Sequence, residues 1–119
     1  MEQDNQGLLH RLRKPTGHVD VVLDTDTYNE IDDQFALAFL VKSPEKLRLR
    51  AVNAAPFFNT KSSGPGDGME KSYAEIMKIL TLMHREDLKG IVKKGSTAYL
   101  PSETEPVDSP AARELAELA

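Results

Sequence analysis

Three segments of the chain have the apolar pattern of β-strands. Residues 19–24 (VDVVLD) are rich in β-branched side chains and end abruptly in polar residues, which predicts a buried strand. Residues 47–55 alternate at first, with Leu47 and Leu49 against arginines, and then become small and apolar, which predicts a second strand. Residues 90–93 (GIVK) predict a short third strand.

Helical spacing separates these strands. Residues 32–41 predict a helix that ends before Pro44, with Ile31, Phe35, Ala38 and Phe39 on one face. A loop over 57–67, rich in Gly, Ser and Pro, precedes the next helix.

The second and third helices have recognisable starts. Asp67 and Glu70 have the spacing of a capping box, which predicts that the second helix begins at Asp67. Ser109 followed by Pro110 predicts the start of the third. The second helix has apolar positions spaced three and four apart, which predicts that they belong to the core: Met69, Tyr73, Ile76, Met77, Leu80 and Met83.

The order β-α-β-α-β-α predicts an α/β fold, with a parallel sheet flanked by helices and right-handed crossovers. Residues 1–17 are interpreted as a flexible N-terminal arm, with one helical turn around 7–13, and residues 18–119 as the folded part. The last helix reaches Ala119 without a glycine, a proline or a basic final turn. We therefore expect a fold truncated after its third β/α unit.

Composition narrows the chemistry. The chain has no cysteine, so disulfides and thiolate-bound metals are excluded, and any metal must bind oxygen or imidazole. A net charge of -4 argues against nucleic acid as the main partner. No apolar run approaches the ~20 residues that span a membrane, and the polar start does not resemble a signal peptide. A cytoplasmic location is the default expectation.

Five acids lie within ten residues at the junction between the first strand and the first helix. Like charges ~4 Å apart repel by ~4 kcal/mol at an effective dielectric of 20, so a divalent cation would relieve such a cluster. The alternative is that Asp32 caps the helix, Asp33 lies near the positive end of its dipole and the rest are solvated. The five acids are Asp24, Asp26, Glu30, Asp32 and Asp33.

Two known motifs that use clustered acids were compared with the segment that begins at Asp24. An EF-hand loop counted from Asp24 would need Gly and Glu where Asn29 and Phe35 stand, which excludes it. A haloacid-dehalogenase-like phosphatase also begins with Asp-x-Asp after its first strand, with Asp24 as nucleophile and magnesium as its metal. That family has Thr or Val where this chain has Tyr28, and it gives no reason for the Asp32–Asp33 pair. The phosphatase stays an alternative.

The segment VVLDTDTYNEIDDQFALAF, residues 21–39, resembles the signature of the inosine–uridine-preferring nucleoside hydrolases. That signature is an apolar strand ending in Asp-x-Asp, a short loop, and Asp-Asp opening an apolar helix. The resemblance implies a Rossmann-like fold and a calcium-dependent N-glycosidase of purine and pyrimidine salvage. Such an enzyme cleaves ribonucleosides into ribose and free base with a water activated by calcium.

The resemblance also implies a role for each acid of the motif. Asp26 and Asp33 would bind calcium, and Asp26 would also take a proton from the attacking water. Asp32 would bind a ribose hydroxyl, and Asp24 would support the cluster through hydrogen bonds. An oxocarbenium-like sugar, which forms as the glycosidic bond breaks, is favoured by negative groups below the ring.

The family usually has an asparagine after its second strand that contacts ribose. Asn59 is the candidate here and Asn53 the substitute, because the common Gly-Asn is absent. The family takes further calcium ligands and a leaving-group acid from its later half, and nothing after residue 60 supplies them. We therefore expect this chain alone to be inactive. A non-catalytic cation-binding remnant is the other alternative, and a homo-oligomer is a further implication of the resemblance.

Overall fold

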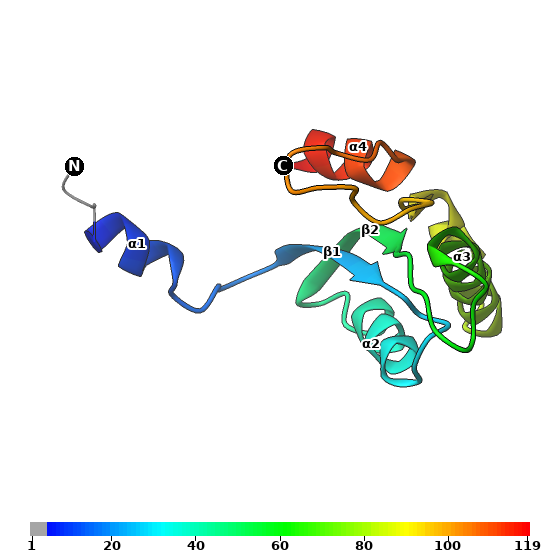
Figure 1. Cartoon of the computed structure of the whole chain (residues 1–119). Coiled ribbons are helices and arrows are strands. Elements are labelled where there is room, and N and C mark those ends of the chain that lie inside the picture. Colours follow the sequence, from blue (N-terminus) through cyan, green and yellow to red (C-terminus); the bar gives the residue numbers. More distant parts are fainter. Residues whose placement is uncertain (1–4) are drawn as a thin grey trace.

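The computed structural model describes residues 5–119, so the first four residues of the predicted arm lie outside the described part (Figure 1). The expected α/β fold with a parallel sheet and flanking helices is confirmed. The helical turn predicted around 7–13 is found two residues earlier as a short helix (α1), and a 3-10 helix (η1) adds to the predicted order. The elements are α1 Asn5–Arg11, β1 Val19–Thr25, α2 Asp32–Val41, β2 Leu47–Ala54, α3 Pro65–Leu82, η1 Glu86–Ile91, β3 Val92–Lys94 and α4 Pro110–Leu118.

The sheet has the order β1-β2-β3, and both strand pairs are parallel. Right-handed crossovers that advance in one direction place α2 and α3 on the same face. The two helices and the sheet form one core, which includes Leu37, Val52, Ile76 and Leu80. α4 packs on β2 and β3 from the other side of the sheet (Figure 1). This arrangement leaves β1 at an edge of the sheet.

A β-bulge at Arg50 interrupts the pairing of the two longer strands. Val21 lies opposite Leu49, whereas Val22 lies opposite Ala51, so Arg50 is the extra residue. The bulge explains the change of pattern in the second strand. Leu49 before it and Val52 after it both pack into the α2–α3 core, although a regular strand would turn them to opposite faces.

The first strand is less buried than its sequence predicts. Thr25 is the only buried residue of β1, and the apolar residues before it are half-buried. The prediction of a buried strand is therefore wrong for residues 19–24. β1 has a neighbouring strand on one side only, and α4 covers mainly β2 and β3 rather than β1.

Helix α2 has the predicted bounds but buries a different face. Leu37 and Val41 are its buried residues, and they pack in the core. The predicted face is turned outward, with Ile31 and Phe35 each 69% exposed and Phe39 66% exposed. Helical spacing alone could not choose between two apolar faces of the same helix.

Helix α3 begins two residues earlier than predicted. Pro65 occupies the first turn and Gly64 precedes it without a side-chain cap, so Asp67 is not the N-cap. The carboxylate of Asp67 instead accepts a hydrogen bond from the backbone N–H of Ser63 at 2.9 Å. The predicted apolar stripe of this helix is confirmed as part of the core.

The last two elements follow their predictions closely. β3 begins at Val92, two residues after the predicted start, because the residues before it form η1. The Ser109 hydroxyl accepts a hydrogen bond from the backbone N–H of Ala112 at 3.1 Å, which confirms the predicted N-cap of α4. Within residues 5–119, no helix has the length and apolar character needed to cross a membrane.

Candidate functional site

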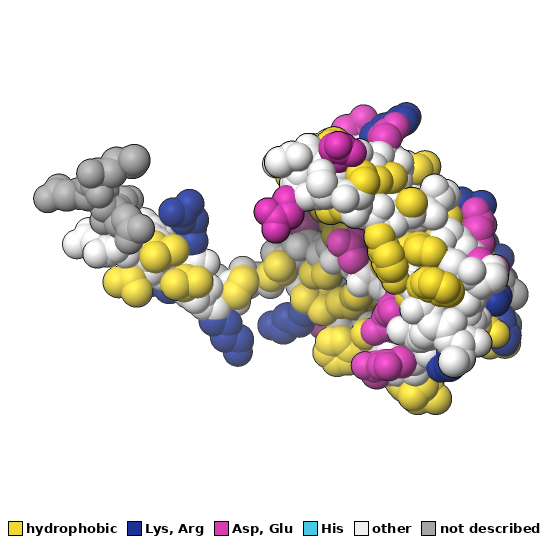
Figure 2. All heavy atoms as spheres, in the orientation of Figure 1, with side chains coloured by type: hydrophobic (Ala, Val, Ile, Leu, Met, Phe, Trp, Pro, Cys, Tyr) yellow, Lys and Arg dark blue, Asp and Glu magenta, His cyan; other side chains and the backbone are white. Residues whose placement is uncertain are grey.

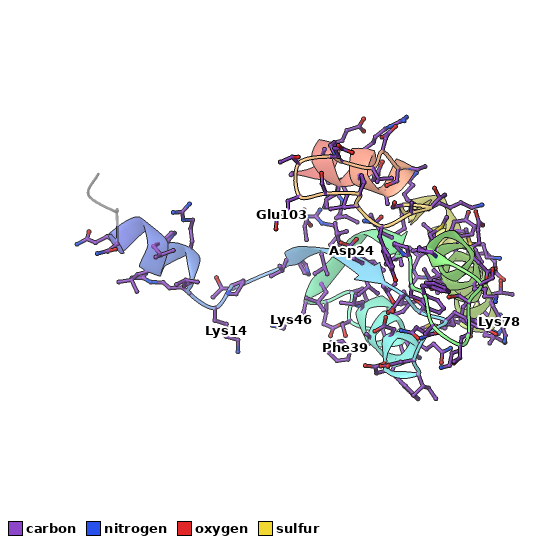
Figure 3. The ribbon with its side chains drawn as sticks, in the orientation of Figure 1. Lys14, Asp24, Phe39, Lys46, Lys78 and Glu103 are labelled. Atoms are coloured by element: carbon purple, nitrogen blue, oxygen red, sulfur yellow. The ribbon has the colours of Figure 1, made fainter. Side chains whose placement is uncertain are left out.

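The candidate site lies at the carboxyl ends of β1 and β2, where sites of parallel α/β folds form. The loop after β1 carries Asp26 and leads into α2, whose first turn contains Asp32 and Asp33. The loop after β2 carries Asn59. Figure 3 labels Asp24 at this end of β1.

A hydroxyl and a second carboxylate hold Asp33. The Thr25 hydroxyl donates to Asp33 Oδ2 at 2.7 Å, and its oxygen also lies 2.7 Å from the hydroxyl oxygen of buried Thr27. Burial raises the pKa of Asp33 above its ordinary value of 3.8, and the Thr25 hydrogen bond opposes that rise. The adjacent Asp26 raises the pKa further, through contact and through charge, and Asp32 adds a smaller repulsion. Asp26 and Asp33 therefore form a close carboxylate pair.

A chain of amide groups links Asp26 to the loop after β2. Asn29 Nδ2 donates to Asp26 Oδ2 at 2.8 Å, and Asn29 Oδ1 accepts from Asn59 Nδ2 at 2.5 Å. The ammonium of Lys61 donates to the backbone carbonyl of Asn29. Asn59 therefore contacts the carboxylate pair through Asn29.

Asn29 was not among the residues singled out from the sequence. Its position in a polar loop, three residues after Asp26, was only a weak indication of a role in the site, because asparagine is common in turns. The two residues are joined by a turn in which the backbone N–H of Asn29 donates to the Asp26 carbonyl at 2.7 Å.

Asp24 lies on the opposite face of β1 from Thr25, as strand alternation requires. Its carboxylate accepts a hydrogen bond from Asn53 Nδ2 at 2.7 Å, and Asn53 is its direct neighbour on β2. The predicted support for the cluster is therefore not a contact with Asp26 or Asp33. Asn53 Oδ1 is buried with no hydrogen-bond partner among the described residues.

Asp32 is exposed at the start of α2, where Ile31 takes the N-cap position without a side-chain cap. The alternative in which Asp32 caps the helix is therefore wrong. Its carboxylate is close enough to Asp33 to act on it through charge. An exposed acid beside a carboxylate pair is available to accept a hydrogen bond from a ligand hydroxyl.

Two carboxylates in contact offer hard oxygen ligands to a divalent cation. No ion pair recorded among residues 5–119 includes Asp26 or Asp33. No group of three Asp, Glu or His side chains in the described part of the chain could hold a metal. The pair alone is therefore not a complete metal site.

No family model, curated protein or solved structure matches this chain. The assignment of the site accordingly rests on the geometry of the carboxylate pair and on the motif in the sequence.

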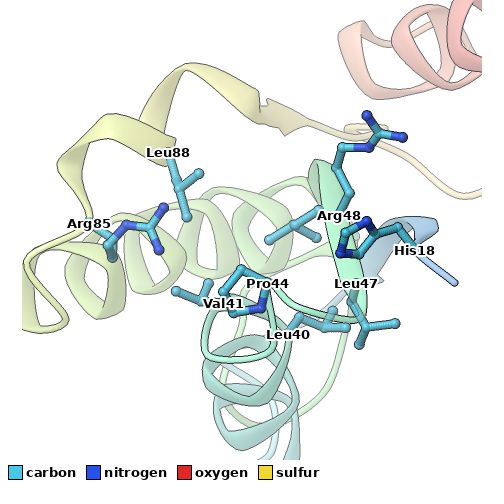
Figure 4. Close-up of a pocket in the computed structure, with 9 residues that line it drawn as sticks. His18, Leu40, Val41, Pro44, Leu47, Arg48, Arg85 and Leu88 are labelled. Atoms are coloured by element: carbon cyan, nitrogen blue, oxygen red, sulfur yellow. The ribbon is translucent and has the colours of Figure 1, made fainter.

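A separate cavity of about 410 Å³ lies near the amino end of β2 (Figure 4). His18, Arg48 and Arg85 line it together with apolar residues of α2, β2 and η1. Arg48 is paired with Asp20 at 2.5 Å and Arg85 with Asp87 at 2.9 Å. The cavity lies away from the carboxylate pair, so it is not part of the candidate site.

We expect Asp33→Asn to stabilise the metal-free chain at neutral pH. Because folding raises the Asp33 pKa, its ionisation costs the folded state free energy. That cost is absent below the ordinary pKa of 3.8 and complete above the raised value, so stability falls with rising pH through this window. Thermal unfolding with a chelator should show a higher Tm for Asp33→Asn at pH 7 and little difference near pH 3.5. If Asp33→Asn lowered the Tm equally at pH 7 and pH 3.5, the hydrogen bond from Thr25 to Asp33 would outweigh the repulsion between the carboxylates.

Proposed function

We propose that this chain carries the calcium- and ribose-binding part of a nucleoside hydrolase, an enzyme that cleaves the N-glycosidic bond of ribonucleosides. The observation that carries the proposal is the close pair of Asp26 and Asp33 at the junction of β1 and α2, with burial and repulsion raising the pKa of Asp33. A divalent cation bound between the two carboxylates would offset the repulsion between them. The Asp-x-Asp and Asp-Asp pattern of residues 24–33 supports the same assignment.

The donor set fits calcium in type. Calcium prefers six to eight oxygen ligands and accepts irregular arrangements of carboxylates, carbonyls, hydroxyls and water. Asp26 and Asp33 would hold the ion, and ligand hydroxyls and water would supply part of the remainder. When bound, calcium would fix two ribose hydroxyls and lower the pKa of the attacking water.

The residues of this chain would then have distinct tasks. Asp26 would accept the proton of the attacking water, while Asn29, which donates to its Oδ2, would hold that carboxylate in place. Asp32 would accept a hydrogen bond from a ribose hydroxyl. Asn59, which is exposed beside Asn29, is the candidate for a second ribose contact. Together the carboxylates would favour the positive charge that develops on the sugar.

We expect ribose release from inosine and uridine to require calcium. The assay should use the protein encoded by the complete open reading frame, with added calcium, with a chelator, and with calcium restored. Loss of activity on chelation and recovery with calcium is the expected result, because the bound ion would help to activate the water and orient the sugar.

A phosphate ester serves as the control substrate in the same preparation. Hydrolysis of the ester with magnesium, and none of nucleosides, would overturn the proposal in favour of the phosphatase with Asp24 as nucleophile. Calcium binding without any hydrolysis would favour the non-catalytic alternative.

A further inference from the structure

Two apolar surfaces of this chain are exposed on separate parts of it. The arm face is formed by Leu8, Leu9 and Leu12, which are 45%, 63% and 72% exposed. The outer stripe of α2 is formed by Ile31, Phe35 and Phe39, which follow one another at intervals of four residues. Figure 2 shows apolar side chains gathered on the arm, which extends away from the folded body. Figure 3 shows Phe39 on the outer side of α2.

The arm helix is too short to be stable by itself. α1 has seven residues and none of them is buried. Isolated helices shorter than about 12–15 residues are marginal in water, so most of their stability comes from packing an apolar face. A surface that covers the arm face would therefore stabilise α1.

The arm is basic, and the amino end of the outer stripe is acidic. Residues 5–17 contain Arg11, Arg13 and Lys14 and no acid. Residues 28–41 contain Glu30, Asp32 and Asp33 and no basic residue. The basic residues of the arm follow its apolar face, and the acids lie at the amino end of the outer stripe. An antiparallel arrangement of α1 on α2 brings these charges together and pairs apolar with apolar.

We propose that the arm face of one copy docks antiparallel on the outer stripe of a second copy, so that two chains exchange their arms. The outer stripe thereby buries large apolar side chains that a monomer exposes, and each dimer contains two equivalent contacts. The partner is a second copy of this chain, because the complementary arm is part of the chain itself.

The connection of the arm disfavours docking on the same chain. The arm enters β1 beside the carboxyl end of α2, where Gly17 and Phe39 line one cavity and the Val19 N–H donates to the Lys46 carbonyl at 2.9 Å. Docking in cis would therefore leave Arg13 near that end and away from Glu30. To bring Arg13 to Glu30 in cis, the linker would have to run back along the whole of α2, which is only about 15 Å long. The leucines of the arm face would then lie beyond the amino end of the outer stripe.

Engineered cysteines test the exchange directly, because the chain has none of its own. Leu9→Cys and Phe35→Cys chains, each a single variant, are mixed and mildly oxidised. A disulfide between the two different chains is the expected product, seen on a non-reducing gel and confirmed by mass spectrometry. Leu100→Cys, at a residue 64% exposed and outside both surfaces, replaces Phe35→Cys in the control mixture. Equal yields in the two mixtures would refute the exchange.

Sedimentation equilibrium of the 119-residue chain gives a second test that needs no cysteine. Phe35→Asp should raise the dimer dissociation constant at least about tenfold, because each dimer loses two apolar contacts. Glu30→Lys should weaken the dimer, and Arg13→Glu in the same chain should restore it, whereas Glu86→Lys, at an exposed acid of η1 outside both surfaces, should have little effect. A wild-type chain that is monomeric up to millimolar concentration would overturn the proposal. A double Leu9→Cys, Phe35→Cys chain that closes only within itself would also overturn it.

Discussion

Replacing Asp33 with asparagine is expected to lower calcium affinity by at least about 100-fold. The substitution removes one of two adjacent carboxylates, and the loss of even an outer hydrogen-bond partner costs 10–100-fold in many metal sites. Asp26→Asn should have the same effect on binding. In the protein encoded by the complete open reading frame it should also reduce ribose release about 1,000-fold, because it would remove the proposed proton acceptor as well as a proposed calcium ligand. Calorimetric titration with calcium and a ribose-release assay measure the two effects.

Asp20→Asn is the matched control for these variants. Asp20 is an exposed acid of β1, and it is paired with Arg48 and Arg50. Its replacement should leave calcium affinity unchanged. The higher Tm expected for metal-free Asp33→Asn would also show that this variant is folded, so its loss of calcium binding would not be due to misfolding. Undiminished calcium affinity in both Asp26→Asn and Asp33→Asn would exclude the carboxylate pair as the metal site.

Gly68→Ala is expected to destabilise the fold by about 3 kcal/mol, at the upper end of the range for overpacked cores. A Cβ added at Gly68 would overlap the carbonyl oxygen of Phe57 and would lie 2.8 Å from Cδ1 of its ring. Phe57 is buried and begins the loop that carries Asn59. The strain can be relieved only by a shift of α3 or of this loop. Urea denaturation at pH 7 measures the loss as a lower midpoint at an unchanged m-value.

Gly90→Ala provides the control for that experiment. Gly90 is exposed at the end of η1, and a Cβ there would meet nothing within 4 Å. The free energy of unfolding should change by less than about 0.5 kcal/mol. Equal effects of the two substitutions would mean that glycine flexibility, and not the close approach of α3 to Phe57, sets the cost.

The elements of this fold could be predicted where one local signal was decisive. α4 begins where Ser109 and Pro110 indicate, and α2 has its predicted bounds. The start of α3 was misjudged because Asp67 matched a capping box while Pro65, a residue typical of first turns, lay two positions before it. The exposed face of α2 could not be predicted, because its burial depends on which surface the sheet and α3 cover.

The proximity of Asp26 and Asp33 was predictable from the sequence, whereas the contacts around them were not. The spacing of Asp26 and Asp33 follows the chain through one loop and one helical turn, so local sequence was enough to pair them. The hydrogen bond between Asn59 and Asn29 joins loops that are 30 residues apart. Such a contact depends on the register of two strands, which no local pattern reveals.

The bulge at Arg50 bears on how this sheet tolerates changes in chain length. Asp24 lies opposite Asn53 and Thr25 opposite Ala54 only because one residue of β2 is left out of the pairing. A chain without Arg50 would form a regular strand with these same neighbours, and it would lose only the ion pair that Arg50 makes with Asp20 at 3.3 Å. The strand thus contains a spare residue, and evolution could vary its length while the carboxylates and amides at its end kept their places.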